Sequence, residues 1–252
     1  MSNFLDYFSQ QASLYVKYRP QYPSALFEYL VSIVSQTDCA WDCGCGNGQA
    51  SVSLKAYFNK VIGTDPSASQ IANAVQEEGI IYRVEPGEKT TIESQSIDLV
   101  TVAQALHWLK QDIFYEEVRR VLKPSGIIAV WSYLLMEIDE GIDQLIRKYY
   151  RNIVRDYFPP EIKLIEEQYQ TIYFPFQELD APKFSLEARY SLPEILAFLE
   201  TWSGTQNYIS VHQRNPLDQI EDDLTAVWGD ITTSKLVRWP LYLRLGRLKE
   251  LA

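Results

Sequence analysis

The sequence predicts an α/β fold built on a mostly parallel β-sheet, with a helical addition in the second half of the chain. Up to about residue 133, short apolar segments alternate with helix-permitting segments. Strands that are apolar on both faces are typical of a parallel sheet covered by helices on both sides. After residue 137 the alternation gives way to a helical, tyrosine-rich stretch. A chain of 252 residues, 46% of them hydrophobic, is long enough for one such domain with an insertion.

The first half is expected to hold five strands separated by helices. A strand is expected where a short apolar run ends at a turn, and a helix where a cap or a proline precedes an amphipathic run. Pro23 suits the first turn of a helix, and Ser67 can cap another. The expected strands are 39–43, 61–65, 80–84, 97–104 and 127–133, and the expected helices are 24–35, 49–58, 67–78 and 111–122, the last ended by Lys123-Pro124-Ser125-Gly126.

The second half is expected to form a cap and two closing strands. Residues 137–180 are predicted to be a helical cap inserted after the fifth strand, and Pro159-Pro160 ends its main helix. Pro240 predicts an edge or a bulge in the last strand. The whole chain, 1–252, is expected to be one domain. The remaining expected elements are helices over 144–158, 193–202 and 216–228, strands over 184–190 and 236–245, and an N-terminal segment, 1–23, over the site.

Composition disfavours two classes of partner. The formal net charge is -10, and a nucleic-acid partner requires a basic surface. No apolar run approaches the roughly 20 residues that span a bilayer. The first six residues lack the basic and apolar regions of a signal peptide. We therefore expect a cytoplasmic protein, a monomer or weak dimer, that binds neither nucleic acid nor membrane.

The three cysteines lie within one predicted strand and turn. Cys39, Cys43 and Cys45 contain no C-x-x-C pair, and the chain has two histidines. Metal sites built from cysteine usually show such pairs with further ligands. We therefore expect small apolar side chains packed around a tight turn, and no metal.

A glycine-rich turn after the first strand is the most specific motif. Gly44, Gly46 and Gly48 are each one residue apart, so the loop can bend tightly and expose backbone groups to a ligand. About twenty residues on, Asp65 ends the second strand, where a carboxylate can accept both hydroxyls of a ribose. The spacing differs from the G-x-G-x-x-G turn of dinucleotide folds. Asp42 would repel a pyrophosphate and suits an ammonium or sulfonium ligand.

The pattern D-x-G-x-G-x-G followed by an acidic second strand end resembles the class I S-adenosylmethionine-dependent methyltransferases. Further segments resemble the small-molecule type 11 branch, which includes the trans-aconitate methyltransferase-like enzymes. The resemblance is close over residues 8–133 and topological beyond them. It implies a Rossmann-like, seven-stranded sheet, mostly parallel with an antiparallel closing strand. The segments that carry it are Phe8-x3-Ala12-x2-Tyr15-x3-Arg19-Pro20-x-Tyr22-Pro23, the run from Ser96 to His107-Trp108, and Glu117-Val118-x-Arg120-Val121-Leu122-Lys123-Pro124-x-Gly126.

The resemblance implies S-adenosyl-L-methionine as cofactor and assigns residues to it. The glycines would meet its methionine part, Asp65 its ribose, and the backbone carbonyls of Ala103 and Gln104 its ammonium. Asp65 could instead be a capping acid, and Asp42 a turn acid bonded to local backbone N–H groups. The expected cofactor residues are Asp42, Gly44, Cys45, Gly46, Gly48, Asp65, Pro66, Gly87, Glu88, Ala103 and Gln104.

The adenine end departs from the family pattern. Many relatives place an aspartate at the position of Pro86, where it bonds the adenine amino group. Proline has no such group, so we expect backbone groups of Gly87 and Glu88 to take its place. Glu88 could equally be a surface-loop residue.

The expected acceptor site combines the N-terminal segment with the turn after the fourth strand. Tyr15, Tyr18 and Arg19 are expected to contact the substrate, the arginine by clamping a carboxylate. The alternative is that they pack over the sheet edge, with Arg19 paired to a surface acid. His107 is either a general base or substrate anchor, or a packing residue, with equal weight. Trp108 is expected to pack the pocket wall.

The resulting hypothesis is methyl transfer to a small molecule by in-line displacement. A carboxylate or phenol acceptor is favoured, and the tyrosine-rich stretch from Tyr149 to Tyr173 is expected to close over an aromatic or apolar substrate. The alternatives are a non-catalytic adenosylmethionine-binding module and a nicotinamide oxidoreductase. The acidic charge disfavours methylation of a macromolecule.

Overall fold

A single sheet organises the residues that the computed structural model describes, 20–249, and within them it has eight strands. The strand order is β3-β2-β1-β4-β5-β8-β6, and β7 pairs with the first half of β8. The predicted fold class is confirmed, with one strand more than the seven expected. The strands are β1 (Cys39–Cys43), β2 (Lys60–Asp65), β3 (Ile80–Val84), β4 (Ile97–Ala103), β5 (Leu122–Ser132), β6 (Gln177–Leu179), β7 (Phe184–Tyr190) and β8 (Lys235–Arg247).

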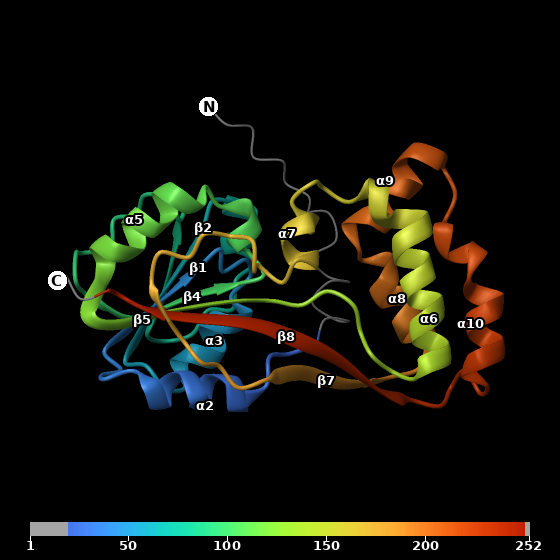
Figure 1. The fold of residues 1–252 in the computed structure, drawn as a ribbon, viewed down its shortest axis with the longest axis horizontal. Coiled ribbons are helices and arrows are strands. Elements are labelled where there is room, and N and C mark those ends of the chain that lie inside the picture. The colour runs from blue at the N-terminus through green and yellow to red at the C-terminus, as the bar shows by residue number, and fades with distance from the viewer. Residues whose placement is uncertain (1–19, 250–252) are drawn as a thin grey trace.

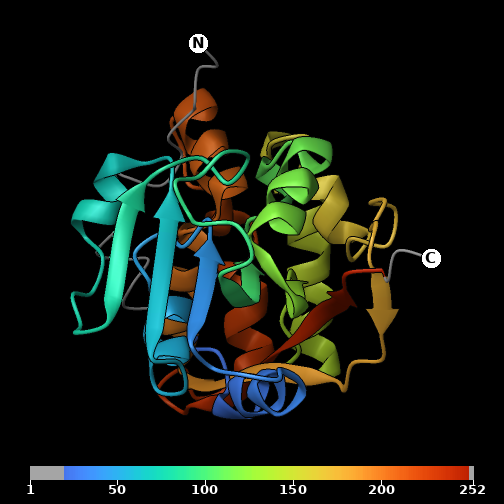
Figure 2. The same ribbon diagram turned by 90° about the vertical axis from the view of Figure 1, so that its left-hand side faces the viewer.

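Strands β1 to β5 are parallel, and the first three run side by side in Figure 2. The central strands β1 and β4 are buried almost throughout. Helices α2 (Ser24–Ile33) and α3 (Gln49–Lys55) cover one face of the sheet, and α5 (Gln111–Val121) covers the other (Figure 1). The carboxyl ends of the parallel strands therefore meet at one edge, which is where ligands bind in open sheets of this kind.

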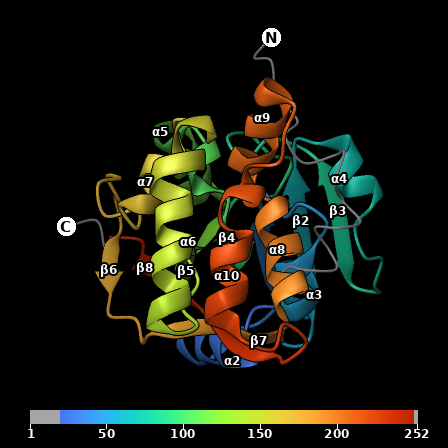
Figure 3. The same ribbon diagram turned by 90° about the vertical axis from the view of Figure 1, so that its right-hand side faces the viewer.

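The remaining helices form a second layer beyond that edge. In Figures 1 and 3, α6, α8, α9 and α10 lie together, and α7 lies between them and the sheet. This layer draws on segments before and after β6 and β7, so it extends beyond the predicted 137–180 cap. Strand β8 continues from the sheet into it. The helices are α6 (Glu140–Tyr149), α7 (Ile162–Glu166), α8 (Leu192–Glu200), α9 (Ser203–His212) and α10 (Glu221–Trp228).

Several predicted boundaries shift. The helix expected over 67–78 is α4 (Ala68–Ala72), which ends at Asn73. The helix expected over 144–158 ends at Tyr149 and continues as a π-helical and a 3-10 turn. Strand β5 begins at Leu122, the last residue of the helix expected over 111–122, and includes the turn expected at 123–126. Helix α9 is not predicted at all.

Pro240 lies where β8 pairs on one side. It pairs with Ser185 of β7, and the pairing with β5 starts only at Tyr242. The predicted edge position of this proline is thus confirmed. Among the described residues, no helix has the length and apolar character needed to cross a membrane.

Candidate functional site

The glycine turn after β1 cannot accept side chains at two of its three glycines. All three take positive φ, 67° at Gly44, 54° at Gly46 and 91° at Gly48. A Cβ on Gly44 would lie 2.5 Å from Cβ of Ala105, and one on Gly48 would lie 2.1 Å from Oη of Tyr82. Gly46 is open, since its nearest neighbour would be 3.8 Å away. The turn therefore packs against β3 at Gly48 and against the end of β4 at Gly44, and it has free space at Gly46.

Asp65 ties the end of β2 to this turn. Its carboxylate accepts hydrogen bonds from the backbone N–H of Gly46, at 3.0 Å, and of Ser67, at 2.8 Å. Ser67, as predicted, caps α4 by accepting from the backbone N–H of Gln70 at 3.2 Å. Asp65 is therefore no helix cap. Its charge is fixed beside the open centre of the glycine turn, with Pro66 next to it in the chain.

Asp42 is buried behind the turn. Its two carboxylate oxygens accept hydrogen bonds from Ser51 Oγ of α3, at 2.6 Å, and Thr101 Oγ1 of β4, at 3.0 Å. Burial raises its pKa to about 6, although both hydroxyls oppose this shift. These two side-chain partners belong to neighbouring elements, and the backbone of Ser51 also lowers the pKa of Asp42 by hydrogen bonding. Asp42 is thus held by α3 and β4 behind the turn.

The cysteines are packing residues. Cys43 and Cys45 are buried, and all three thiols are free. Burial is the main cause that raises the pKa of both buried thiols well above the usual value. Within the part of the chain that the structure describes, no group of three or more His, Cys, Asp or Glu is placed to hold a metal ion.

The loop after β3 reaches the end of β1. A Cβ on Gly87 would lie 2.4 Å from Sγ of Cys43, so this glycine allows a close approach. The side chain of Glu88 turns away to the surface, where its Oε1 accepts from the backbone N–H of Lys110 at 2.9 Å. Pro86 is exposed. The Glu88 side chain is thus engaged at the surface, while the backbone at Gly87 lies close to Cys43 at the end of β1.

The end of β4 lies against the glycine turn through Ala105. Gln104, which follows Ala103, takes a left-handed φ of 56°. Its side-chain amide donates to the backbone oxygen of Tyr133, at 2.9 Å, and accepts from its N–H, at 3.1 Å. The amide is therefore engaged in joining the ends of β4 and β5. The polar groups that this segment offers a cofactor are those of its backbone.

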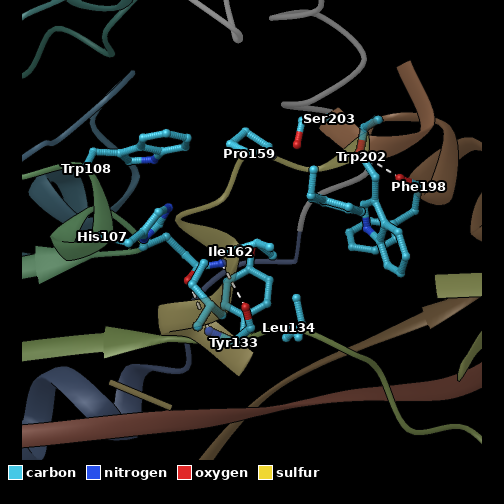
Figure 4. A pocket seen from close by; sticks show the side chains of 13 residues that line it. His107, Trp108, Tyr133, Leu134, Pro159, Ile162, Phe198, Trp202 and Ser203 are labelled. Carbon is cyan, nitrogen blue, oxygen red and sulfur yellow. Dashed lines mark hydrogen bonds between the residues drawn. The ribbon is translucent and has the colours of Figure 1, made fainter. Parts of the chain in front are cut away.

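A cavity of about 100 Å³ lies between these strand ends and the helical layer. Figure 4 shows His107 and Trp108 on one side and Phe198 and Trp202 on the other. Gln104 also lines it, so the cavity adjoins the cofactor residues. No lysine or arginine lines it among residues 20–249. Its apolar wall includes Leu134, Phe158, Ile162, Ile165, Phe198 and Trp202.

His107 lies in a 3-10 turn, Leu106–Trp108, and its side chain reaches this cavity. Its Nδ1 lies 2.8 Å from Oη of the buried Tyr169. Burial lowers the pKa of His107 to about 3, so the imidazole is neutral at physiological pH. Trp108 is 39% exposed and its ring centre is 4.8 Å from that of His107. The structure thus places both predicted residues at the cavity.

The other residues predicted to line the acceptor site are not seen at the cavity. Tyr15, Tyr18 and Arg19 lie outside the described residues. The tyrosines expected to close over the substrate do not line the cavity: Tyr149 and Tyr150 are buried, with hydroxyls bonded to Thr205 and Glu166. They hold the helical layer together instead. The predicted stretch does reach the cavity, through Phe158, Ile162 and Ile165. Phe198 and Trp202 were not singled out, because they approach the strand ends only in the folded chain.

The strand order, the glycine turn and the acid at the end of β2 define a nucleoside-binding enzyme fold. Residues 41–130 match the family described as a methyltransferase domain. A Dictyostelium discoideum protein named as a methyltransferase is 35% identical, covering 98% of this chain and 96% of its own. A Saccharomyces cerevisiae protein named as an S-adenosylmethionine-dependent methyltransferase is 29% identical, covering 95% and 96%. The chain belongs to the class I S-adenosylmethionine-dependent methyltransferases.

A solved structure supports the same assignment. It is described as a Type II methyltransferase from Anaeromyxobacter dehalogenans and has a TM-score of 0.87 at 37% identity, covering 91% of this chain and 97% of its own. The Bacillus YcgJ protein, at a TM-score of 0.54 and 15% identity, shares the fold alone. The predicted family and cofactor are therefore confirmed, and the trans-aconitate-like branch stays a prediction.

Proposed function

We propose that this methyltransferase methylates a carboxylate or phenol oxygen of a small, largely apolar molecule by in-line displacement. The observation that carries the proposal is the aromatic cavity beside Gln104, at the edge of the sheet where the cofactor residues meet. Its apolar walls suit an apolar molecule, and its few polar groups suit orientation of one functional group. The net charge of -10 supports a substrate other than nucleic acid.

The residues at the glycine turn and at the end of β2 fit the cofactor. The turn packs tightly at Gly44 and Gly48, but the space around Gly46 leaves room for a ligand beside the carboxylate of Asp65. We assign the ribose to Asp65 and Pro66, the methionine part to residues 44–48 and the adenine to the backbone of Gly87 and Glu88. Asp42 and the carbonyls of Ala103 and Gln104 favour the ammonium. When bound, the cofactor supplies an electrophilic methyl group.

The chain's own contribution to the reaction is placement and exclusion of water. Phe158, Phe198 and Trp202 face the cavity and leave little room for solvent. Holding an acceptor in line beside an electrophile lowers the barrier by several kcal/mol through orientation alone. Hydrogen bonding from His107 can fix the acceptor's polar group. No acid or base chemistry is needed when the acceptor is already ionised.

Partners and location complete the proposal. We propose a cytoplasmic monomer or weak dimer whose partner is the small methyl acceptor. An acidic surface keeps such a chain soluble and disfavours polyanions.

A screen of acceptors tests the proposal. The protein is incubated with methyl-deuterated S-adenosylmethionine and matched apolar carboxylic acids, phenols and amines, and mass spectrometry detects transfer of the label. We expect methyl esters or aryl methyl ethers and no N-methyl products. Label found only in added protein or nucleic acid contradicts a small-molecule acceptor. Cofactor binding by calorimetry without turnover of any acceptor supports the non-catalytic alternative.

A further inference from the structure

A buried tyrosine that the sequence did not single out as a site residue contacts His107 behind the acceptor cavity. Oη of Tyr169 lies 2.8 Å from Nδ1 of His107, and the two rings are stacked with centres 6.1 Å apart. Tyr169 is fully buried and His107 is 8% exposed. Nδ1 of His107 is therefore engaged inside the protein, and Nε2 is the ring nitrogen left for the cavity.

The direction of this hydrogen bond follows from the protonation state of the phenol and its requirement for an acceptor. Burial raises the pKa of Tyr169 well above its usual value, so the hydroxyl keeps its proton. A buried O–H group needs an acceptor. Among the hydrogen bonds of the described residues, this hydroxyl pairs with Nδ1 of His107. Ser132 and the backbone N–H groups of His107 and Leu106 lie close enough to lower the pKa of the phenol as donors to its oxygen, which leaves its O–H for Nδ1. Tyr169 thus donates, and the proton of the neutral imidazole lies on Nε2.

Tyr169 has a strained backbone conformation that neighbouring residues stabilise. Gln168 and Tyr169 both take left-handed φ, 55° and 58°, a conformation that bulky residues rarely adopt. Arg244 of β8 donates to the backbone oxygens of Tyr169, at 2.6 Å, and Ile172, at 2.9 Å. Arg244 is itself paired with Glu178 at 2.7 Å. Strained residues that the surroundings hold in place are frequent at functional sites.

We infer that Tyr169 is a positioning residue that fixes His107 as a hydrogen-bond donor, and not a base, at the acceptor cavity. The inference rests on the proposed function, and it deepens it by choosing between the two acceptors. A neutral Nε2–H group can hold one oxygen of a carboxylate while the other reacts. The carboxylate oxygen that is not held by Nε2–H forms the O–CH₃ bond. The CH₃–S bond breaks at the same time and leaves its electron pair on sulfur, and no proton has to leave. A phenol would need a base to take its proton.

The tautomer can be measured without turnover. The chain has two histidines, so ¹⁵N-histidine labelling of the cofactor-free protein gives two ring spectra, and His212→Gln assigns them. We expect His107 to carry its proton on Nε2 and to stay neutral down to about pH 5. Tyr169→Phe should mix the two tautomers. Tyr115→Phe is the matched control, because Tyr115 is equally buried and its hydroxyl makes no hydrogen bond among the described residues. A proton on Nδ1 in the unmodified protein overturns the inference.

Kinetics with a carboxylate acceptor tests the role. His107→Gln keeps an N–H donor without a base, so it should retain most of the activity that His107→Ala loses. Tyr169→Phe should lower kcat/KM by about tenfold, the value of one hydrogen bond, with an unchanged cofactor Kd. With S-adenosylmethionine and acceptor saturating at each pH, so that any pH dependence of cofactor binding is removed, kcat should be flat between about pH 5.5 and 8, since no group near neutrality acts as base. Equal loss in the glutamine and alanine variants, or a kcat that rises through pH 6 to 7 under saturation, contradicts the donor role. If no carboxylate is turned over, the proposed function fails while the tautomer measurement still decides the position of the proton.

Discussion

Asp65 is the residue to which we assign the ribose of the cofactor. Its carboxylate is anchored by the backbone N–H groups of Gly46 and Ser67, so it is oriented before any ligand arrives. A ribose would add two charge-assisted hydrogen bonds to it. Preorganisation of this kind reduces the ordering cost of binding.

We therefore predict that Asp65→Asn weakens S-adenosylmethionine binding by about 10–100-fold, because each hydrogen bond to a charged group contributes about 1.5–3 kcal/mol. Calorimetric titration measures the Kd. Asp218→Asn, an exposed change in the 3-10 turn Pro216–Gln219, is the control and should bind normally. An unaltered Kd in Asp65→Asn would remove this residue from the cofactor site.

If Asp42 attracts the ammonium of the cofactor, as proposed, the cofactor affinity depends on pH. Its pKa of about 6 means that it loses negative charge on acidification, and only the ionised form attracts the cofactor's ammonium. We predict that affinity rises between about pH 5 and 7.5 in the unmodified protein and is nearly flat in Asp42→Asn. Titrations at several pH values check this. The same slope in both proteins would assign the pH dependence to another group.

At the scale of elements, most strands are predicted and the helical layer is predicted in part. Helices α8 and α10 lie at the predicted ranges 193–202 and 216–228, whereas β6 and α9 are not predicted. Strands β1 and β7 begin and end where the apolar and alternating patterns predict, because burial on the sheet faces dictates those residues. Helix α9 has the sequence SGTQNYISVH, and many of these residues are weak helix formers. It forms through contacts made by the rest of the fold, which a local pattern cannot show.

The candidate site divides in the same way. The glycine turn, Asp65 and His107 could be found because special backbone angles and titratable groups leave a mark in the sequence. Tyr169 left none, since neither it nor Gln168 is of a type that marks a left-handed turn. Its position depends on Arg244, 75 residues further along the chain.

Gly204 sets how closely α9 approaches the cavity wall. A Cβ there would lie 2.2 Å from the ring of Phe158 and 2.9 Å from the backbone oxygen of Val154. We predict that Gly204→Ala destabilises the protein by about 2 kcal/mol, since overpacking against a backbone atom costs about 3, at the upper end of its range, and the gain in helix propensity is about 1. Chemical denaturation measures it. Ser210→Ala, an exposed change on the same helix, should have little effect; equal stability of Gly204→Ala would mean that Phe158 moves freely.

At the scale of the whole molecule, the acceptor cavity joins two layers. One side comes from the ends of β4 and β5, and the other from α7, α8 and the residues that follow α8. Arg244 on β8 holds the turn that places Tyr169, so the last strand reaches the cavity through a loop from the helical layer. Global unfolding must therefore dismantle the site and expose His107.

That exposure links global stability to pH. Burial lowers the pKa of His107 to about 3 in the folded chain, against an ordinary value of 6.5 once unfolded. Between these values the unfolded state binds the extra proton, so this group destabilises the folded chain increasingly as pH falls below about 6.5. Asp42 acts in the opposite sense, because its raised pKa favours the folded state on acidification. The two contributions must be separated by a variant.

We predict that the free energy of unfolding of the unmodified protein, relative to His107→Gln, falls by roughly 2–3 kcal/mol between about pH 7 and 4.5, at about 1.4 kcal/mol per pH unit below 6.5. Asp42 is present in both proteins, so its contribution cancels in the difference. Denaturant titrations of both proteins at matched pH values measure it. A difference that does not change with pH would show that His107 takes up its proton as easily in the folded chain as in the unfolded one. The imidazole would then be open to solvent, and neither its burial nor its hydrogen bond from Tyr169 could hold it neutral at the acceptor.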